Sequence, residues 1–146
     1  RTDWVERGGV FDENTCKVAA SNGQLRLLKW LHGRGCPWDE MTCWGAANEG
    51  HLEVLQWLRQ EGCPCDSRAC WGAAEGGHLE VLQWLREEGC PWDTMTLTCA
   101  VENEHLELLR WAIENGCPYD QWHIRHFITD PDFLAWFEGY EETALY

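Results

Sequence analysis

Residues 36–62 contain two short stretches in which apolar positions recur with the period of an α-helix. The first stretch, 40–49, has a narrow apolar side made of small residues, which would let a neighbouring helix approach closely. The second stretch, from 51 to about 60, is apolar over roughly 220° of its circumference, more than a helix with a single packing partner needs. Its apolar residues are Leu52, Val54, Leu55, Trp57 and Leu58. We therefore predict a pair of short helices, the second of which is packed on several sides.

Capping and breaking residues mark the ends of both predicted helices. Asp39 stands just before the first helix, where its side chain would accept hydrogen bonds from free backbone N–H groups, and Pro37 restricts the chain that leads into it. Gly50 ends the first helix and Gly62 ends the second, because glycine adopts the left-handed conformation that often follows a helix. Residues 36–62 are therefore predicted to form a helix, a turn, a helix and a turn.

The same pattern of 27 residues recurs along the chain. The sequence Cys-Pro-x-Asp begins at residues 36, 63, 90 and 117, and Asp12 continues the register toward the N-terminus. Repetition at such a period is typical of stacked helix pairs, so we predict a single all-α domain that forms an α-solenoid. Its repeat units are 9–35, 36–62, 63–89 and 90–116. Residues 1–8 are expected to belong to a partial unit, and residues 117–146 to a divergent C-terminal cap of two short helices, the second starting at Pro131.

Three segments of the repeat units resemble a known family. They are AANEGHLEVLQWLRQEGC, AAEGGHLEVLQWLREEGC and AVENEHLELLRWAIENGC. They are similar to the ankyrin repeat, which has two alanines, two variable residues, Gly-His, an aliphatic helix and a closing pair of glycine and a small residue. The resemblance covers about residues 9–120 and implies stacked helix pairs that bind other proteins.

The chain departs from the ankyrin pattern in two ways. Its repeat is shorter than the usual ~33 residues, and the Cys-Pro-x-Asp turn leaves no room for a full β-hairpin finger between units. The Thr-Pro-Leu-His opening of the first helix is also missing. Such shortened copies resemble the degenerate ankyrin arrays of algae, other protists and large DNA viruses. We therefore expect the β-hairpin fingers to be shortened or absent.

The distribution of charge narrows the choice of partner. The formal net charge is −14, and residues 36–146 carry five Lys and Arg against 21 Asp and Glu. Such a surface repels phosphate backbones, so we expect no nucleic-acid partner and favour a protein with a basic or mixed apolar and basic surface. No run of residues approaches the roughly 18 apolar positions of a membrane span, so none is predicted.

The nine cysteines are interpreted as reduced thiols. Their number is odd, no secretory signal is recognisable, and equivalent cysteines in stacked units would lie about 8–10 Å apart, too far for a disulfide. We expect an intracellular, reducing compartment, either the cytoplasm or an organelle.

Residues that could carry chemistry have structural interpretations beside the functional ones. His51, His78 and His105 begin the second helices, where the ankyrin resemblance implies a structural role in the turn. Cys63 and Cys65 are a close thiol pair, but zinc would need two more ligands and no CxxC or His-x₃-His partner is present. His123 and His126, three residues apart, could share a helix face near Cys117 and form the other candidate ligand group. No phosphate-binding glycine motif or nucleophile motif is present. We therefore predict no metal, no cofactor and no enzymatic activity.

The outward side of the first helices varies from unit to unit and is the predicted binding surface. Trp44 and Trp71 are the expected anchors, because tryptophan is enriched among interface hot spots. The alternative for both is packing between first helices over Gly45 and Gly72. The predicted partner-binding residues are Met41, Trp44, Asn48, Arg68, Trp71, Glu75, Met95, Thr98 and Glu102.

Two functions follow from this sequence, and a third, a cysteine-based redox or metal protein that would contain stoichiometric zinc or iron, is disfavoured. The first is a non-enzymatic protein–protein interaction module that binds a partner on the concave face of the first helices. The second is a structural subunit that is held permanently in a larger complex. An autonomous module should be monomeric by itself, whereas a permanent subunit should aggregate or be poorly soluble alone.

Overall fold

The computed structural model describes residues 11–144, and every regular element in this range is a helix. The turns between units, at 36–39, 63–66, 90–93 and 117–120, contain no strand. The predicted all-α class is therefore confirmed for the described part of the chain. The prediction of a partial unit at 1–8 lies outside the described residues.

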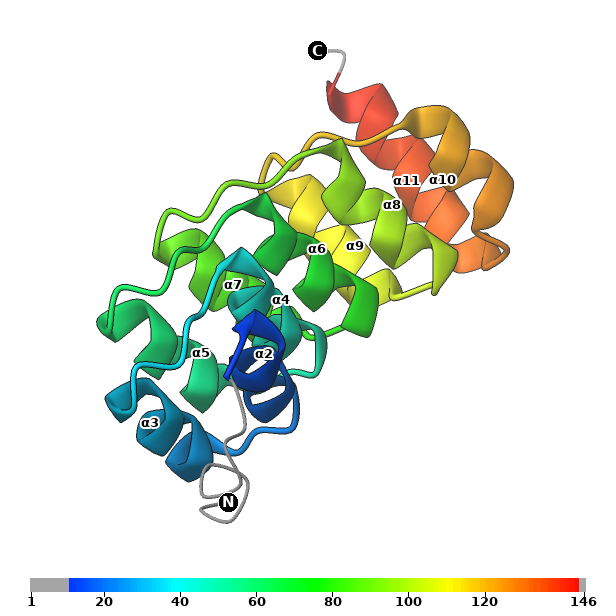
Figure 1. Cartoon of the computed structure of the whole chain (residues 1–146). Coiled ribbons are helices and arrows are strands. Elements are labelled where there is room, and N and C mark those ends of the chain that lie inside the picture. Colours follow the sequence, from blue (N-terminus) through cyan, green and yellow to red (C-terminus); the bar gives the residue numbers. More distant parts are fainter. Residues whose placement is uncertain (1–10, 145–146) are drawn as a thin grey trace.

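Each repeat unit is a pair of short helices, and the pairs follow one another along the molecule (Figure 1). The first helices are α2 (Glu13–Ser21), α4 (Glu40–Asn48), α6 (Ser67–Gly76) and α8 (Thr94–Glu102). The second helices are α3 (Leu25–Gly33), α5 (Leu52–Gln60), α7 (Leu79–Glu87) and α9 (Leu106–Glu114). The C-terminal cap consists of α10 (Gln121–Phe127) and α11 (Pro131–Ala144), and Pro131 begins a helix as predicted.

Each first helix starts directly after an aspartate. The Asp39 carboxylate accepts the backbone N–H of Met41 at 2.9 Å, and the Thr42 hydroxyl accepts the N–H of Asp39 at 3.4 Å. These bonds satisfy donors that the first turn of a helix leaves without partners. The predicted N-cap role of Asp39 is therefore confirmed. The N-caps of the other first helices and of α10 are Asp12, Asp66, Asp93 and Asp120.

The turn between the two helices of a unit is covered by a histidine of the next unit. Gly50 has a φ of 78°, and a Cβ at this residue would lie 2.6 Å from the ring of His78. The same ring places Nε2 3.1 Å from the carbonyl oxygen of Asn48. His105 covers Gly77 in the same way. Glycine is required at this turn because of both the left-handed backbone and the histidine that packs on it.

Glu104 occupies the corresponding position in unit 90–116, with a φ of 50°. Gly50 is covered by His78 and Gly77 by His105, and the equivalent residue for Glu104 is Asp132. A side chain at residue 104 therefore meets no imidazole ring. Its carboxylate oxygen Oε1 instead accepts the backbone N–H and the hydroxyl of Thr129, both at 3.0 Å. These bonds tie the last repeat unit to the cap.

The cysteine of each turn joins consecutive units. Its thiol faces the backbone carbonyl oxygen of the N-cap aspartate one unit earlier, which is the geometry of a weak S–H···O hydrogen bond. The pairs are Cys36 with Asp12 at 3.6 Å, Cys63 with Asp39 at 3.6 Å, Cys90 with Asp66 at 3.4 Å and Cys117 with Asp93 at 3.7 Å. Their strict recurrence in the sequence thus has a structural cause.

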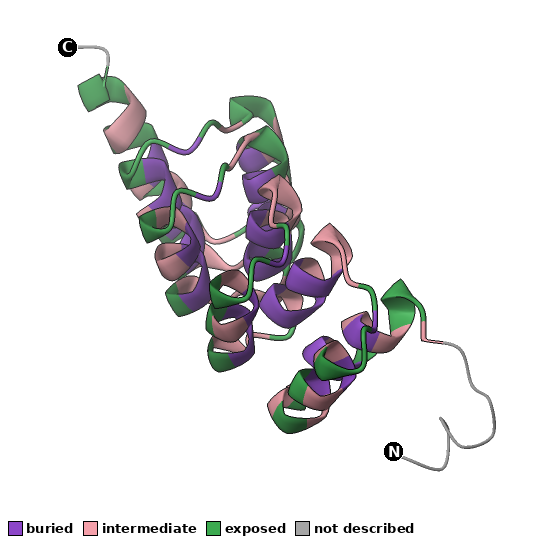
Figure 2. Cartoon of the chain, turned by 60° about the vertical axis from the view of Figure 1, so that its left-hand side comes forward, coloured by how far each residue is buried: buried purple, intermediate pink, exposed green. Residues whose placement is uncertain are grey.

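The core lies between the row of first helices and the row of second helices (Figure 2). First helices contribute small buried side chains such as Ala46 and Ala47, and second helices contribute larger ones such as Leu55 and Leu58. Consecutive first helices consequently lie closer together than consecutive second helices do. Small side chains on one row and large ones on the other therefore set the spacing of the stack.

Candidate functional site

The predicted binding residues lie on the side of the first helices that faces away from the core. Met41 and Arg68, one repeat apart, touch through Nη1 of Arg68 and Sδ of Met41 at 3.6 Å. The Arg68 guanidinium also pairs with Asp66 at 2.8 Å and with Glu40 at 3.6 Å. Hydrogen bonds from Arg68 lower the pKa of Asp66 below its ordinary value. The cation in this row is therefore already neutralised by the protein's own carboxylates.

Trp44 packs along the gap between two first helices. Its carbonyl oxygen and its Cδ1 atom would lie 3.0 and 3.1 Å from a Cβ at Gly72 on α6. On its other side the Lys17 ammonium lies 5.3 Å from the centre of the indole ring, within range of a cation–π contact. The side chain is half-buried in this position. Its packing role is thus observed, and part of the ring still faces solvent.

Trp71, like Trp44, contacts a neighbouring first helix. Its indole Nε1 donates a hydrogen bond of 2.7 Å to Oδ1 of Asp93, the N-cap residue of α8. This bond attaches the middle of α6 to the start of the next first helix. Trp71 is also half-buried, so the packing alternative raised by the sequence has direct support at both tryptophans.

The remaining predicted residues differ in exposure. Glu75 and Glu102 are exposed near the C-terminal ends of their helices, whereas Asn48 and Thr98 are half-buried. The carbonyl oxygens of Asn48 and Glu75 receive His78 and His105 of the following units, at 3.1 and 2.9 Å. The structural interpretation of these two histidines is confirmed. Met95 is 47% exposed, the most open apolar residue among the predicted set.

The face of the first helices continues into the cap at a residue outside the predicted set. Trp122 on α10 follows Met95 by one repeat period and is 59% exposed. It stacks on His126, with ring centres 4.2 Å apart. The signal was available, because Met41, Arg68 and Met95 already define a row with the period of the repeat. The divergent sequence of the cap obscured its next member.

Exposed apolar residues are concentrated on the first helices and on α10. Within residues 11–144, the large hydrophobic side chains that are exposed are Val18, Met95, Trp122 and Phe127. Val18 belongs to α2, Met95 to α8, and the other two to α10. The exposed large apolar side chains therefore lie on α2, α8 and α10, and Met95 and Trp122 are one repeat period apart.

Carboxylates surround this apolar surface. Acidic residues outnumber basic ones on the first helices, on α10 and at the residues directly flanking them. The acidic residues are Asp12, Glu13, Asp39, Glu40, Glu49, Asp66, Glu75, Asp93, Glu102 and Asp120, and the basic ones are Lys17, Arg68 and Arg125. Arg125 is itself paired with Glu138 and Glu141 of α11. The net field over this face is negative.

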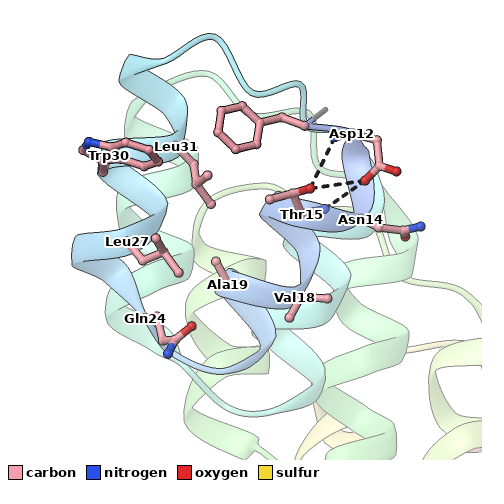
Figure 3. A pocket seen from close by; sticks show the side chains of 10 residues that line it. Asp12, Asn14, Thr15, Val18, Ala19, Gln24, Leu27, Trp30 and Leu31 are labelled. Carbon is pink, nitrogen blue, oxygen red and sulfur yellow. Dashed lines mark hydrogen bonds between the residues drawn. The ribbon is translucent and has the colours of Figure 1, made fainter. Parts of the chain in front are cut away.

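A separate apolar groove lies at the α2–α3 end of the stack (Figure 3). It has a volume of about 410 Å³, and its apolar walls include Val18, Leu27 and Trp30. In unit 36–62 the equivalent positions of Val18 and Leu27 are Gly45 and Val54, both of which are buried. The groove therefore corresponds to the side on which the later units are covered by the unit before them.

The residues considered as metal ligands are dispersed or held in local contacts in the described part of the chain. No group of three or more His, Cys, Asp or Glu side chains within residues 11–144 is arranged to hold a metal ion. All nine cysteines are free thiols. His126 Nδ1 lies 2.8 Å from the carbonyl oxygen of Trp122, and the ring of His123 stacks on Phe127 at 4.4 Å. These two histidines are thus engaged in local contacts.

None of the helices in residues 11–144 has both the length and the hydropathy needed to cross a membrane. A scan against models of known protein families finds no match, and a search of curated proteins finds no relative of this chain.

Proposed function

We propose that the chain is a degenerate ankyrin-like solenoid that binds a partner protein, without catalysis, on the face of its first helices and α10. The observation that carries this proposal is the exposure of Met95 on α8 and Trp122 on α10, one repeat period apart on neighbouring helices. Apolar groups exposed together on one side of a protein are typical of interaction sites. The closer spacing of the first helices also bends the stack toward them, which favours a concave face.

The partner we propose carries basic residues next to an apolar or aromatic side chain. The carboxylates around Met95 and Trp122 would attract Lys and Arg and raise the rate of association at low salt. The exposed indole of Trp122 offers a large apolar contact area and an N–H donor, as hot-spot residues do. The apolar contact would supply the affinity, and the surrounding carboxylates would supply the selectivity.

Met95 and Trp122 test the proposal better than Trp44 and Trp71. Replacing Trp71 would also remove its bond to Asp93, and replacing Trp44 would open the gap beside Gly72, so both changes alter stability. The exposed residues Met95 and Trp122 leave the core unchanged when they are truncated. A loss of binding in these variants therefore reports on the surface itself.

The experiment is selection of peptides from a random display library on the intact protein. We expect enriched peptides that combine Lys or Arg with an aromatic or aliphatic residue, and whose binding weakens as salt is raised. The Met95→Ala and Trp122→Ala double variant should bind them at least about 30-fold more weakly, because a hot-spot truncation costs about 2 kcal/mol. Gln56→Ala, an exposed change on second helix α5, serves as the control. Equal binding by the double variant and the wild type would refute the proposed surface.

The alternative, a permanent structural subunit, is favoured by the apolar groove beside Val18, Leu27 and Trp30. A protein with such a face would bury it against another chain for most of its lifetime. Analytical ultracentrifugation of the isolated protein separates the two functions. A monomer at micromolar concentration supports the autonomous module, and self-association that is abolished by Val18→Asp supports the subunit.

A further inference from the structure

The turn of unit 63–89 differs from every other turn in one residue. Where the other units have Phe11, Trp38, Trp92 or Tyr119, this unit has Cys65. The aromatic residues pack on a ring of their own unit or of the cap. Trp38, for example, lies 5.7 Å from Trp57, and Trp92 lies 5.8 Å from Trp111. Cys65 has no ring and cannot make this packing contact. The presence of a cysteine at this position therefore needs another explanation.

Cys65 faces the turn cysteine of the following unit. The sulfur atoms of Cys65 and Cys90 are 3.4 Å apart, and either thiol can be the donor between them. A disulfide requires about 2.05 Å, so the two sulfurs need to approach each other by roughly 1.4 Å. Cys65 is half-buried, whereas Cys90 is 3% exposed. One sulfur of the pair is thus open to a small reagent and the other is held behind it.

We propose that Cys65 and Cys90 form an oxidisable dithiol, which a small hydroperoxide converts into a disulfide between the turns of units 63–89 and 90–116. This modification site is independent of the partner-binding surface. It assigns a chemical role to the one turn that lacks its aromatic residue.

The surroundings of the pair favour ionisation of one of the two sulfurs. Hydrogen bonds from the thiols of Cys65 and Cys70, and then the positive charge of Arg59, lower the pKa of Cys90 below its ordinary value. Hydrogen bonding with Cys43 and Cys90 and then burial raise the pKa of Cys65. The pair therefore loses one of its two protons readily, and the other lies between the two sulfurs, either of which can be the donor.

Arg59 is available to these sulfurs because it lacks the contacts that the equivalent Arg86 makes. One unit later, Arg86 lies 4.3 Å from the ring centre of Trp92 and donates a 2.7 Å hydrogen bond to the carbonyl oxygen of Cys90. Cys65 takes the place of that ring beside Arg59, and the buried Nε of Arg59 has no hydrogen-bond partner. The same replacement thus supplies both a thiol and a nearby unpaired cationic group.

A second close pair of thiols lacks these properties. The sulfurs of Cys16 and Cys36 are 3.0 Å apart, but the two residues are only 0% and 4% exposed. Burial and the neighbouring Cys36 thiol raise the pKa of Cys16 to about 12. The shorter sulfur–sulfur distance would favour Cys16 with Cys36, whereas access from solvent favours Cys65 with Cys90.

The reaction balances with one hydroperoxide. The remaining proton of the pair can lie on either sulfur. When it lies on Cys90, the Cys65 thiolate attacks the O–O bond, which gives a sulfenic acid and an alkoxide or hydroxide ion. That ion takes the proton from Cys90 and leaves as alcohol or water. The Cys90 thiolate then attacks the Cys65 sulfur and expels hydroxide, which forms the S–S bond. The two sulfurs are oxidised by two electrons, and the hydroperoxide is reduced.

The test is oxidation of the full chain with one equivalent of hydrogen peroxide, followed by alkylation and peptide mass spectrometry. We expect the number of alkylated cysteines to fall from nine to seven and the peptides that contain Cys65 and Cys90 to be cross-linked. Dithiothreitol should restore all nine. Because trypsin leaves Cys63 and Cys65 on one peptide, fragment ions must assign the bridged residue.

Matched variants make the result decisive. Cys65→Trp introduces the residue of units 36–62 and 90–116, and Cys65→Ala removes the thiol without adding bulk; both should abolish the cross-link while circular dichroism stays unchanged. Cys99→Ala replaces a half-buried thiol of α8 that is not part of the pair, and it should leave the cross-link between Cys65 and Cys90 intact. A first cross-link between Cys16 and Cys36 or between Cys63 and Cys65 would overturn the proposal. A cross-link that persists in either Cys65 variant, or oxidation of Cys65 to sulfinic acid without any bridge, would do the same.

Discussion

Replacing Gly72 by alanine tests the close approach of the first helices, which fixes the geometry of the whole stack. A Cβ at Gly72 would lie 3.0 Å from the carbonyl oxygen of Trp44 and 3.2 Å from the backbone nitrogen of Asn48. Both are main-chain atoms of α4, so no side-chain rotation relieves the contact. The two helices have to move apart to accommodate a single methyl group.

Two opposing terms decide the size of the effect. Alanine is favoured over glycine in a helix interior by about 1 kcal/mol. Overpacking a tight contact costs about 1–3 kcal/mol, and here the cost lies in the upper part of that range because backbone atoms are involved. We therefore expect Gly72→Ala to lower the free energy of unfolding by about 1 kcal/mol, which is roughly a fivefold change in the folding equilibrium.

Gly139→Ala is the matched control. Gly139 is exposed within α11, and a Cβ there would meet nothing within 4 Å, so this change keeps the gain in helix propensity and lacks the steric cost. Urea unfolding followed by far-UV circular dichroism should show a stabilisation of up to about 1 kcal/mol for Gly139→Ala and a destabilisation for Gly72→Ala. If both variants are stabilised equally, α4 and α6 do not touch at Gly72 and the packing described above is wrong.

Two further predictions concern the contacts between units and the cap. His78→Ala removes both the bond to the Asn48 carbonyl oxygen and the ring that covers Gly50, so urea unfolding should show a loss of about 1–2 kcal/mol; an unchanged midpoint would contradict the role given to this histidine. Burial, followed by the negative charge of Glu141, raises the pKa of Tyr119 from 10.0 to about 12. Because the folded state favours the neutral phenol, the stability that Tyr119 contributes is complete below pH 10.0 and is lost as the pH rises toward 12. Tyrosinate absorbance should show a lower pKa for this residue in Glu141→Gln, and an identical titration in both proteins would exclude the interaction.

The local features of the repeat were accessible from the sequence because they depend on neighbouring residues. Asp39 was predicted as an N-cap and Gly50 as a helix end, and both are found in those roles. The predicted first helix ended at Glu49 and the observed one ends at Asn48, a difference of one residue. Such assignments rest on hydrogen bonds and backbone conformations that span only a few residues.

The packing of the two face tryptophans required the tertiary structure. The sequence left Trp44 and Trp71 between a binding and a packing role, since both lie at the edge of the outward side. The indole of Trp71 is held by Asp93, which is 22 residues away in the chain and is contributed by the next unit. A helical wheel describes one helix and contains no information on which neighbour an edge residue meets.

Trp122 illustrates a different limit. The repeat period places it in the row of Met95, but α10 has seven residues and a sequence that diverges from the other first helices. Only the observed position of α10 beside α8 establishes that the row continues onto the cap. The most exposed apolar residue of the proposed surface was therefore outside the predicted set.

The sequence by itself determined the helical class, the repeat period and the capping residues, since each depends on local backbone preferences and on the regular alternation of apolar positions. The tertiary structure decided which side chains from different units meet. It showed that turn cysteines bond to the carbonyl oxygens of the preceding unit and that Cys65 faces Cys90. These contacts depend on the distance and rotation between stacked helix pairs, which follow from the packing of small residues on one row against large ones on the other.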